Sequence, residues 1–175
     1  SATQRDTPVL GERASGNCLH NALVWQDRRT AAQCQKMATD KLVDGRPVAE
    51  AISAITGLII DPYFSSTKLT WLLDNVAGAR QAALKDEICF GTVDSFLLWK
   101  LSKGQSHVTD ATNASRTQLF DINEQAWSKE LLAYFDIPQG LLPKVLGWNP
   151  GKRTNGKVQY IIYTCIYKMC FSCEF

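Results

Sequence analysis

The segment from residue 63 to residue 75, YFSSTKLTWLLDN, constrains the fold of this chain more than any other part of it. Its apolar side chains recur at the spacing of one buried helix face, at Leu69, Leu72, Leu73 and then Val76. Ser65 and Ser66 stand just before that face. At the start of a helix, short hydroxyl side chains commonly accept hydrogen bonds from the unpaired backbone N–H groups of the first turn. The pattern therefore predicts a core helix over residues 66–76 with a serine cap.

The rest of the chain alternates between strand and helix signals. A hairpin is predicted at the start, with strands over residues 7–10 and 19–25 and turn residues between them. Further helices are predicted over residues 28–42, 47–55, 79–87, 94–101 and 128–135, and further strands over residues 88–91 and 116–122. This mixed order indicates an α/β or α+β layer fold and leaves the topology open.

The composition allows one domain with a sizeable core, because 45% of the 175 residues are hydrophobic. The formal net charge of +2 is too small to indicate a nucleic-acid surface. No apolar stretch reaches the roughly 20 residues of a membrane helix, and the first residues lack the layout of a signal peptide. Cys18, Cys34 and Cys89 are scattered singly, as free thiols are, so we expect a cytoplasmic protein without a nucleic-acid or membrane partner.

The helix segment also carries a family pattern. In order and without a gap, the first signature of the FGGY carbohydrate kinases is filled by Tyr63, Ser65, Lys68, Leu69, Trp71, Leu72, Asp74 and Asn75. Segments at residues 4–7, 21–30, 56–65, 90–101, 107–122 and 136–145 resemble the glycerol kinase branch of that family. The resemblance covers roughly residues 2–145 and stops there.

The resemblance implies an α/β fold, namely part of a ribonuclease-H-like domain of the actin-like ATPase class. FGGY kinases have two such domains, which close around a cleft for ATP and sugar. It implies that residues 1–145 are an incomplete first domain. The Gly- and Thr-rich phosphate-binding turn of the family would precede Ser1, and the second domain would follow Val145.

Residues 146–175 form a divergent tail that we do not expect to belong to the family fold. Residues 144–175 hold 5 Lys and Arg against 1 Glu, whereas residues 1–143 hold 14 Lys and Arg against 16 Asp and Glu. Cys165, Cys170 and Cys173 have the spacing C-x4-C-x2-C, which also occurs in plant-type iron–sulfur proteins. Such a cluster needs a fourth thiolate, so we favour an erroneous or alternative C-terminus and expect no metal site.

Four residues are candidates for contacts with a small polyol. Arg5 supplies several N–H donors, and the neighbouring Asp6 supplies a carboxylate that only accepts hydrogen bonds. Together they can bind two adjacent hydroxyl groups of a polyol. An adjacent Arg and Asp are, however, commonly a solvated pair on the protein surface. The resemblance aligns them with the glycerol-binding pair of glycerol kinases, where the family usually has Glu in place of Asp6. The matching aromatic positions are Trp25 and Tyr63, whose ring faces can cover the carbon backbone of the substrate. For Trp25, core packing is an equal alternative.

Other polar residues have sufficient structural explanations as helix caps, dipole partners or solvated faces. They are Asp27, Arg28, Arg29, Asp94, Asp110, Asn113 and Arg116. His20 and His107 lack a partner at metal-ligand spacing, and Trp71 and Trp99 lie on apolar helix faces and are assigned to the core. We assign no catalytic residue in this chain.

The resemblance implies an enzyme that transfers the γ-phosphate of ATP, with magnesium, to glycerol and assembles as a homo-oligomer. The sequence has no G-x-x-x-x-G-K-[ST] run, and the family places the general base and the adenine pocket beyond Val145. We expect the chain alone to bind polyol at most, and ATP and magnesium poorly. The alternatives are another FGGY sugar or polyol kinase, and a non-catalytic domain that binds polyol weakly or competes for the enzyme's partner surfaces.

Overall fold

The structure is a computed structural model that describes residues 8–146, and it has a mixed α/β architecture. Its strands form two-stranded sheets. Strand β1 (Val9–Glu12) pairs antiparallel with β2 (Ile88–Gly91), and β3 (Val108–Asp110) pairs parallel with β6 (Lys144–Leu146). A short hairpin joins β4 (Phe120–Asp121) to β5 (Ala126–Trp127). The predicted fold class, mixed strand and helix in layers, therefore holds at the level of architecture.

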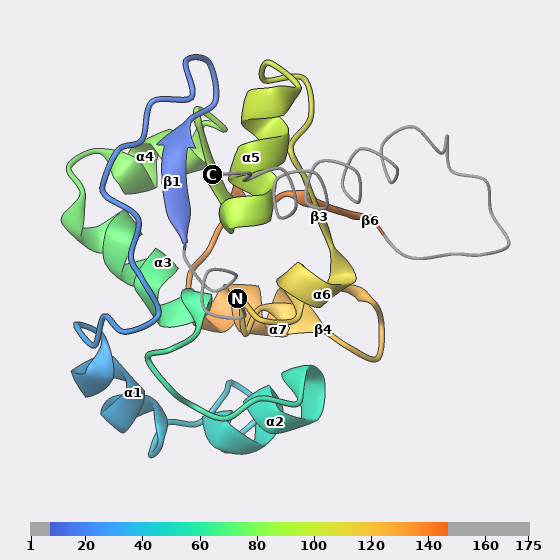
Figure 1. The fold of residues 1–175 in the computed structure, drawn as a ribbon. Helices are drawn as coiled ribbons and strands as arrows, with labels where there is room; N and C mark the ends of the chain where they lie inside the picture. The colour runs from blue at the N-terminus through green and yellow to red at the C-terminus, as the bar shows by residue number, and fades with distance from the viewer. Residues whose placement is uncertain (1–7, 147–175) are drawn as a thin grey trace, which may run out of the picture.

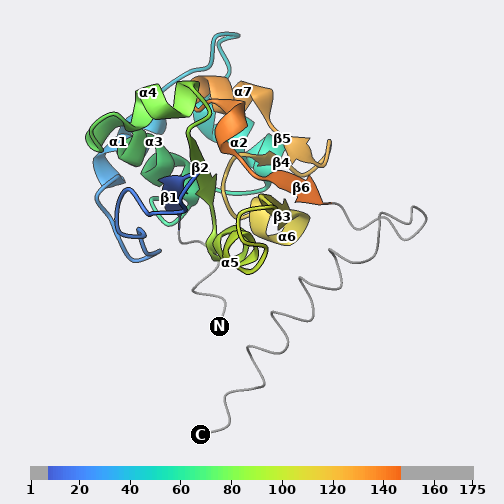
Figure 2. The same cartoon turned by 90° about the horizontal axis from the view of Figure 1, so that it is seen from above.

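Helices cover both sides of the β1–β2 pair, with α3 and α4 on one side and α5 on the other (Figures 1 and 2). The helices are α1 (Ala31–Met37), α2 (Val48–Thr56), α3 (Ser65–Asn75), α4 (Ala79–Leu84), α5 (Val93–Leu101), α6 (Ala111–Ala114) and α7 (Lys129–Tyr134), followed by the 3-10 turn η2 (Gln139–Leu141). Within residues 8–146, no helix is long and apolar enough to cross a membrane.

The core centres on α3, as the apolar spacing predicts. Leu69, Leu72 and Leu73 are at most 2% exposed and join one apolar cluster with residues of α2, α4, β2 and α7. Burying a leucine side chain contributes roughly 1.5 to 3 kcal/mol. This face therefore fixes α3 as the element against which the rest of the described chain packs.

The serine cap predicted for α3 is wrong. The helix begins at Ser65 itself, its N-cap residue is Phe64, and no side chain caps it. The backbone N–H of Ser66 instead donates to the carbonyl of Thr117 at 3.0 Å, and the Ser66 hydroxyl bonds the Gln118 side chain at 2.6 Å. The hydrogen-bonding groups at the start of α3 thus find their partners in a segment far away in the sequence. A local sequence pattern does not indicate such a contact.

Several predicted elements are shorter than expected, while others match closely. The helix over residues 47–55 is α2, with Pro47 as its N-cap residue and Gly57 in the left-handed conformation at its end. The strand over residues 88–91 is β2, with the same bounds. The helix predicted over residues 28–42 is reduced to α1, and the strand over residues 116–122 is reduced to β4.

The predicted N-terminal hairpin is only partly correct. Gly11 of β1 forms an isolated bridge with Cys18, but residues 19–25 follow an irregular path instead of a return strand. The ladder of β1 is made with β2, from a distant part of the sequence. The predictions for Arg5, Asp6 and residues 147–175, including the spacing of Cys165, Cys170 and Cys173, lie outside the described residues.

Candidate functional site

Trp25 and Tyr63, the two aromatic candidates, lie in contact. Their ring centroids are 5.7 Å apart with an interplanar angle of 54°, and Tyr63 also packs edge-on against Phe64 at 5.3 Å. Both Trp25 and Tyr63 are half-buried, so each ring keeps some exposed surface. Because the rings touch each other, they form one continuous aromatic wall and not the two sides of a slot. Such a wall can cover the C–H groups of a small polyol.

The loop before α3 holds Tyr63 in place. The Asp61 carboxylate accepts a hydrogen bond from the Tyr63 backbone N–H at 2.7 Å, and Phe64 anchors the next position in the interior with 7% exposure. Trp25 lies on the irregular segment after the buried Leu23. That segment is attached to α3 further on, where the hydroxyls of Thr30 and Thr67 share a buried hydrogen bond of 2.9 Å.

Lys68 connects the two ring-bearing segments. Its side chain is fully buried, and its Nζ donates to the backbone carbonyl of Tyr63 at 3.1 Å and to that of Trp25 at 3.5 Å. Sequence reasoning counted Lys68 in the family signature but gave it no role at the site. The signal was present, because Lys68 stands four residues before Leu72 and thus on the apolar face of the helix.

Arg116 is a second residue at the wall, although the sequence indicated only a structural use for it. Its guanidinium lies 5.6 Å from the ring centroid of Tyr63 and 5.3 Å from that of Phe64, within the range of cation–π contacts. Arg116 and Tyr63 come from distant parts of the sequence. No local motif indicates their contact, and only the tertiary fold reveals it.

The charged run beside Trp25 has a structural explanation, as predicted. The Arg29 guanidinium bonds the Asp27 carboxylate at 2.8 Å and lies 4.3 Å from the ring centroid of Trp71. The hydrogen bond from Arg29 is the main cause that lowers the pKa of Asp27, with a smaller contribution from the charge of Lys68. The ring of His20 packs edge-on against Trp71 at 5.7 Å. These contacts hold the Trp25 segment against α3.

Asp94 is a buried carboxylate between α5 and β3. It is 8% exposed and accepts hydrogen bonds from the hydroxyls of Thr92 and Thr109, the latter at 2.7 Å. Desolvation raises the pKa of Asp94, and the two hydroxyl bonds offset part of that shift. Asp110 caps α6 by accepting from the Asn113 backbone N–H at 2.8 Å. Asp110 therefore has the capping use expected from the sequence, whereas Asp94 is neither a cap nor on a solvated face: the N-cap residue of α5 is Thr92, and Asp94 is a buried acceptor of hydroxyl hydrogen bonds.

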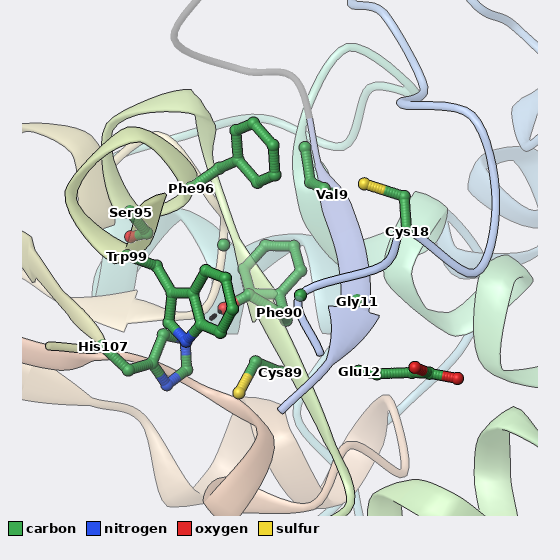
Figure 3. A pocket seen from close by; sticks show the side chains of 12 residues that line it. Val9, Gly11, Glu12, Cys18, Cys89, Phe90, Ser95, Phe96, Trp99 and His107 are labelled. Carbon is green, nitrogen blue, oxygen red and sulfur yellow. Dashed lines mark hydrogen bonds between the residues drawn. The ribbon is translucent and has the colours of Figure 1, made fainter. Parts of the chain in front are cut away.

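A hollow of about 40 Å³ lies between the β1–β2 pair and α5 (Figure 3). Its lining includes Phe90, Phe96, Trp99, Cys89 and His107, and it excludes Trp25 and Tyr63. Burial raises the pKa of the Cys89 thiol and lowers the pKa of His107, whose Nε2 lies 2.7 Å from the Phe90 carbonyl oxygen. The hollow thus holds a thiol and an imidazole whose charged forms are both disfavoured by burial.

The potential metal ligands of the described residues do not gather into a cluster. Between residues 8 and 146 there is no group of three or more His, Cys, Asp or Glu side chains placed to hold a metal ion. In kinases, magnesium is commonly bound through one or two carboxylates together with substrate phosphates and water.

Comparison with known proteins places these features in a family. The profile of the N-terminal domain of the FGGY family of carbohydrate kinases matches residues 1–159. Glycerol kinase 1 of Pseudomonas aeruginosa is 57% identical over 143 residues, which are 82% of this chain and 28% of that protein. The glycerol kinase of Roseobacter denitrificans is 53% identical over 145 residues, covering 81% of this chain and 28% of that protein. The chain thus spans 28% of the length of these relatives.

Solved structures give the same assignment. A crystal structure of Plasmodium falciparum glycerol kinase with ADP matches with a TM-score of 0.75 at 31% identity, over 81% of this chain and 27% of that one. Xylulose kinase from Lactobacillus acidophilus matches with a TM-score of 0.66 at 23% identity, over 82% and 26% of the two chains, which supports the fold alone. The predicted actin-like ATPase fold class is confirmed. The chain belongs to the FGGY family of carbohydrate kinases.

Proposed function

We propose that this chain supplies the glycerol-binding part of a kinase that transfers the γ-phosphate of ATP to glycerol and releases glycerol 3-phosphate. The observation that carries the proposal is the contact between Trp25 and Tyr63, at 5.7 Å between ring centroids, in a chain 57% identical to a glycerol kinase over 143 residues. The family resemblance from the sequence predicts a role in glycerol binding for each of these rings separately. Their contact agrees with one shared site.

The role of the wall is to orient the alcohol. Aromatic faces cover the carbon backbone and exclude water, while hydrogen-bonding groups select the hydroxyls. Arg5 and Asp6 are the proposed hydrogen-bonding pair, on the basis of their alignment with the family. Phosphoryl transfer requires the hydroxyl oxygen and the γ-phosphorus to be in line, so fixing the alcohol contributes to the rate through positioning.

The test uses a chimera in which residues 1–145 of this chain replace the matching segment of Pseudomonas aeruginosa glycerol kinase 1, the 57% identical relative. Loss of a charged hydrogen-bond donor costs roughly 1.5 to 3 kcal/mol, so Arg5→Ala should lower kcat/KM for glycerol roughly 10- to 150-fold. Arg28→Ala, in the solvated charge run, is the matched control and should leave glycerol kinetics unchanged. If Arg5→Ala behaves like Arg28→Ala, Arg5 does not contact the substrate.

The shorter carboxylate gives a second test in the same chimera. If Asp6 takes the place of the usual family Glu, then Asp6→Glu restores one methylene and should raise kcat/KM for glycerol. A panel that includes xylulose separates a glycerol kinase from another FGGY kinase. Higher kcat/KM for xylulose than for glycerol would reject glycerol as the substrate.

The 175-residue chain by itself should have no measurable ATP:glycerol phosphotransferase activity. The chain spans 28% of the length of Pseudomonas aeruginosa glycerol kinase 1, and its sequence has no phosphate-binding run of the G-x-x-x-x-G-K-[ST] type. A coupled ADP assay on purified chain, with Arg5→Ala as the control for contaminating host kinase, tests this. Glycerol-dependent ADP production that disappears in the Arg5→Ala chain would contradict the assignment.

A further inference from the structure

The buried side chain of Lys68 has no part in the glycerol contacts proposed above, yet it bonds the backbone of both ring-bearing residues, Trp25 and Tyr63. Lysine is almost never fully buried, because removing an ammonium group from water is costly unless hydrogen bonds replace the lost hydration. Lys68 is 0% exposed and lies in the first turn of α3, whose Leu69 and Leu72 anchor it in the core. A methionine or leucine would fill such a position at lower cost if only packing were needed.

Two hydrogen bonds of Lys68 go to the main chain at the aromatic wall. Nζ donates to the Tyr63 carbonyl at 3.1 Å and to the Trp25 carbonyl at 3.5 Å. Each carbonyl carbon is bonded directly to the Cα that carries a ring of the wall, so holding the carbonyls restricts how far the two rings can separate. Tyr63 and Trp25 lie on irregular segments, whereas Lys68 lies on the most deeply packed helix.

We propose that Lys68 is a positioning residue that holds the Trp25 ring against the Tyr63 ring and thereby sets the affinity for glycerol. This inference rests on the proposed function of the wall. Without the ammonium, the segment that carries Trp25 keeps its other contacts with α3, such as the Thr30–Thr67 hydrogen bond, but loses the hydrogen bond to the carbonyl of Trp25. The wall then samples open arrangements, and glycerol binds well to only a fraction of the molecules.

Thr67 provides a matched control on the same helix. Its hydroxyl bonds that of Thr30 at 2.9 Å, and both side chains are buried, so the bond joins α3 to the same segment as Lys68 does. It does so through Thr30, five residues beyond Trp25 in the sequence. Thr67→Val removes this bond at nearly constant shape, so it measures the general effect of loosening the segment.

The experiment compares Lys68→Met, Lys68→Gln and Thr67→Val in the full-length chimera with Pseudomonas aeruginosa glycerol kinase 1. Lys68→Met should raise the KM for glycerol about 10-fold or more and leave the KM for ATP within about two-fold of wild type, because a charged hydrogen bond at the glycerol site alone is lost. The amide of Lys68→Gln is too short to reach both carbonyls, so the same split is expected for it. Thr67→Val should lower Tm without changing either KM.

The outcomes separate this inference from the proposed function. An unchanged glycerol KM in Lys68→Met, or equal increases in both KM values, overturns the positioning role; if Lys68→Met does not fold, Lys68→Gln decides by the same criteria. Tyr63→Ala is measured in parallel. If Tyr63→Ala raises the glycerol KM and the Lys68 variants do not, only the role of Lys68 fails. If Tyr63→Ala also leaves it unchanged, the wall is not the glycerol site.

Discussion

At the scale of single residues, Asp94 makes the stability of the folded protein depend on pH, in a direction that follows from its burial. Burial raises the pKa of Asp94, and the nearby charge of Asp110 adds to the shift. The folded protein therefore holds this proton more tightly than the unfolded chain does. The resulting stability is complete below the unfolded pKa of about 3.9 and is lost as the pH rises through the folded pKa.

Replacing Asp94 by Asn should remove this contribution, because the amide does not ionise. We expect the stability of Asp94→Asn relative to wild type to be higher at about pH 8 than at about pH 4.5. Urea unfolding of both proteins at the two pH values measures the difference in stability. The contributions of the other carboxylates are the same in both proteins and cancel in the comparison. A difference that stays constant with pH would show that the pKa of Asp94 is the same in the folded and unfolded states.

Gly16 and Gly45 form a second residue-scale test. Both have positive φ, +70° and +86°, but a Cβ on Gly16 would lie 2.0 Å from the Trp99 ring while one on Gly45 would meet nothing within 4 Å. Gly45→Ala should cost about 1 to 2 kcal/mol from backbone strain alone. Gly16→Ala should cost clearly more in the same denaturation experiment, and equal losses would mean that the Trp99 ring moves aside freely.

At the scale of helices and strands, Ser65 and Ser66 test how α3 begins. Both are 0% exposed, but the Ser65 hydroxyl has no hydrogen-bond partner among the described residues while Ser66 bonds Gln118 at 2.6 Å. Ser66→Ala leaves a buried amide oxygen unsatisfied and should cost about 1 to 3 kcal/mol. Ser65→Ala should be neutral or stabilising. A loss of about 1 kcal/mol on Ser65→Ala would instead restore the serine cap that the sequence predicts.

The elements that the sequence predicts correctly are those with local causes. Pro47 and Gly57 bound α2, and the apolar spacing of Leu69 and Leu72 defines α3, so each signal lies inside its own element. The return strand over residues 19–25 fails because β1 finds its ladder partner in β2, a contact without a local signal. β-strand pairing depends on tertiary context more than helix formation does.

The candidate site follows the same division. Trp25 and Tyr63 could be selected from the sequence because each belongs to a segment that resembles the family. Their contact, the carbonyl bonds of Lys68 and the place of Arg116 over Tyr63 could not, since these join segments far apart in the chain. The helical spacing of Lys68 offered a partial signal, a charged residue on an apolar face.

At the scale of the whole molecule, Arg13 joins three distant segments. Its guanidinium donates to the carbonyls of Asp86 and Gly140, both at 2.9 Å, and thereby links the turn after β1 to the end of α4 and to η2. Arg13→Ala should cost about 1 to 2 kcal/mol in thermal or urea unfolding. Arg13→Lys should recover little, because one ammonium does not reproduce the planar fork.

Arg46 is the comparison for Arg13. Both side chains are exposed, but Arg46 bonds the carboxylates of Asp44 and Glu130, and such exposed ion pairs contribute little, whereas Arg13 bonds backbone carbonyls of distant segments. We expect Arg46→Ala to change Tm less than Arg13→Ala does. The opposite order would mean that the three segments at Arg13 are held together by packing and not by its hydrogen bonds.

The pairing of β1 with β2 also sets the order of events during refolding. Residues 9–12 reach their partners at residues 88–91 only after the chain has closed a loop that contains α1 to α4. Closing so long a loop costs chain entropy before any ladder bond repays it, and folding rates fall as the sequence separation of contacts grows. The β4–β5 hairpin and α3 can form locally. In pulse-labelling hydrogen exchange, amides of α3 should gain protection early, and those of β1 should be among the last.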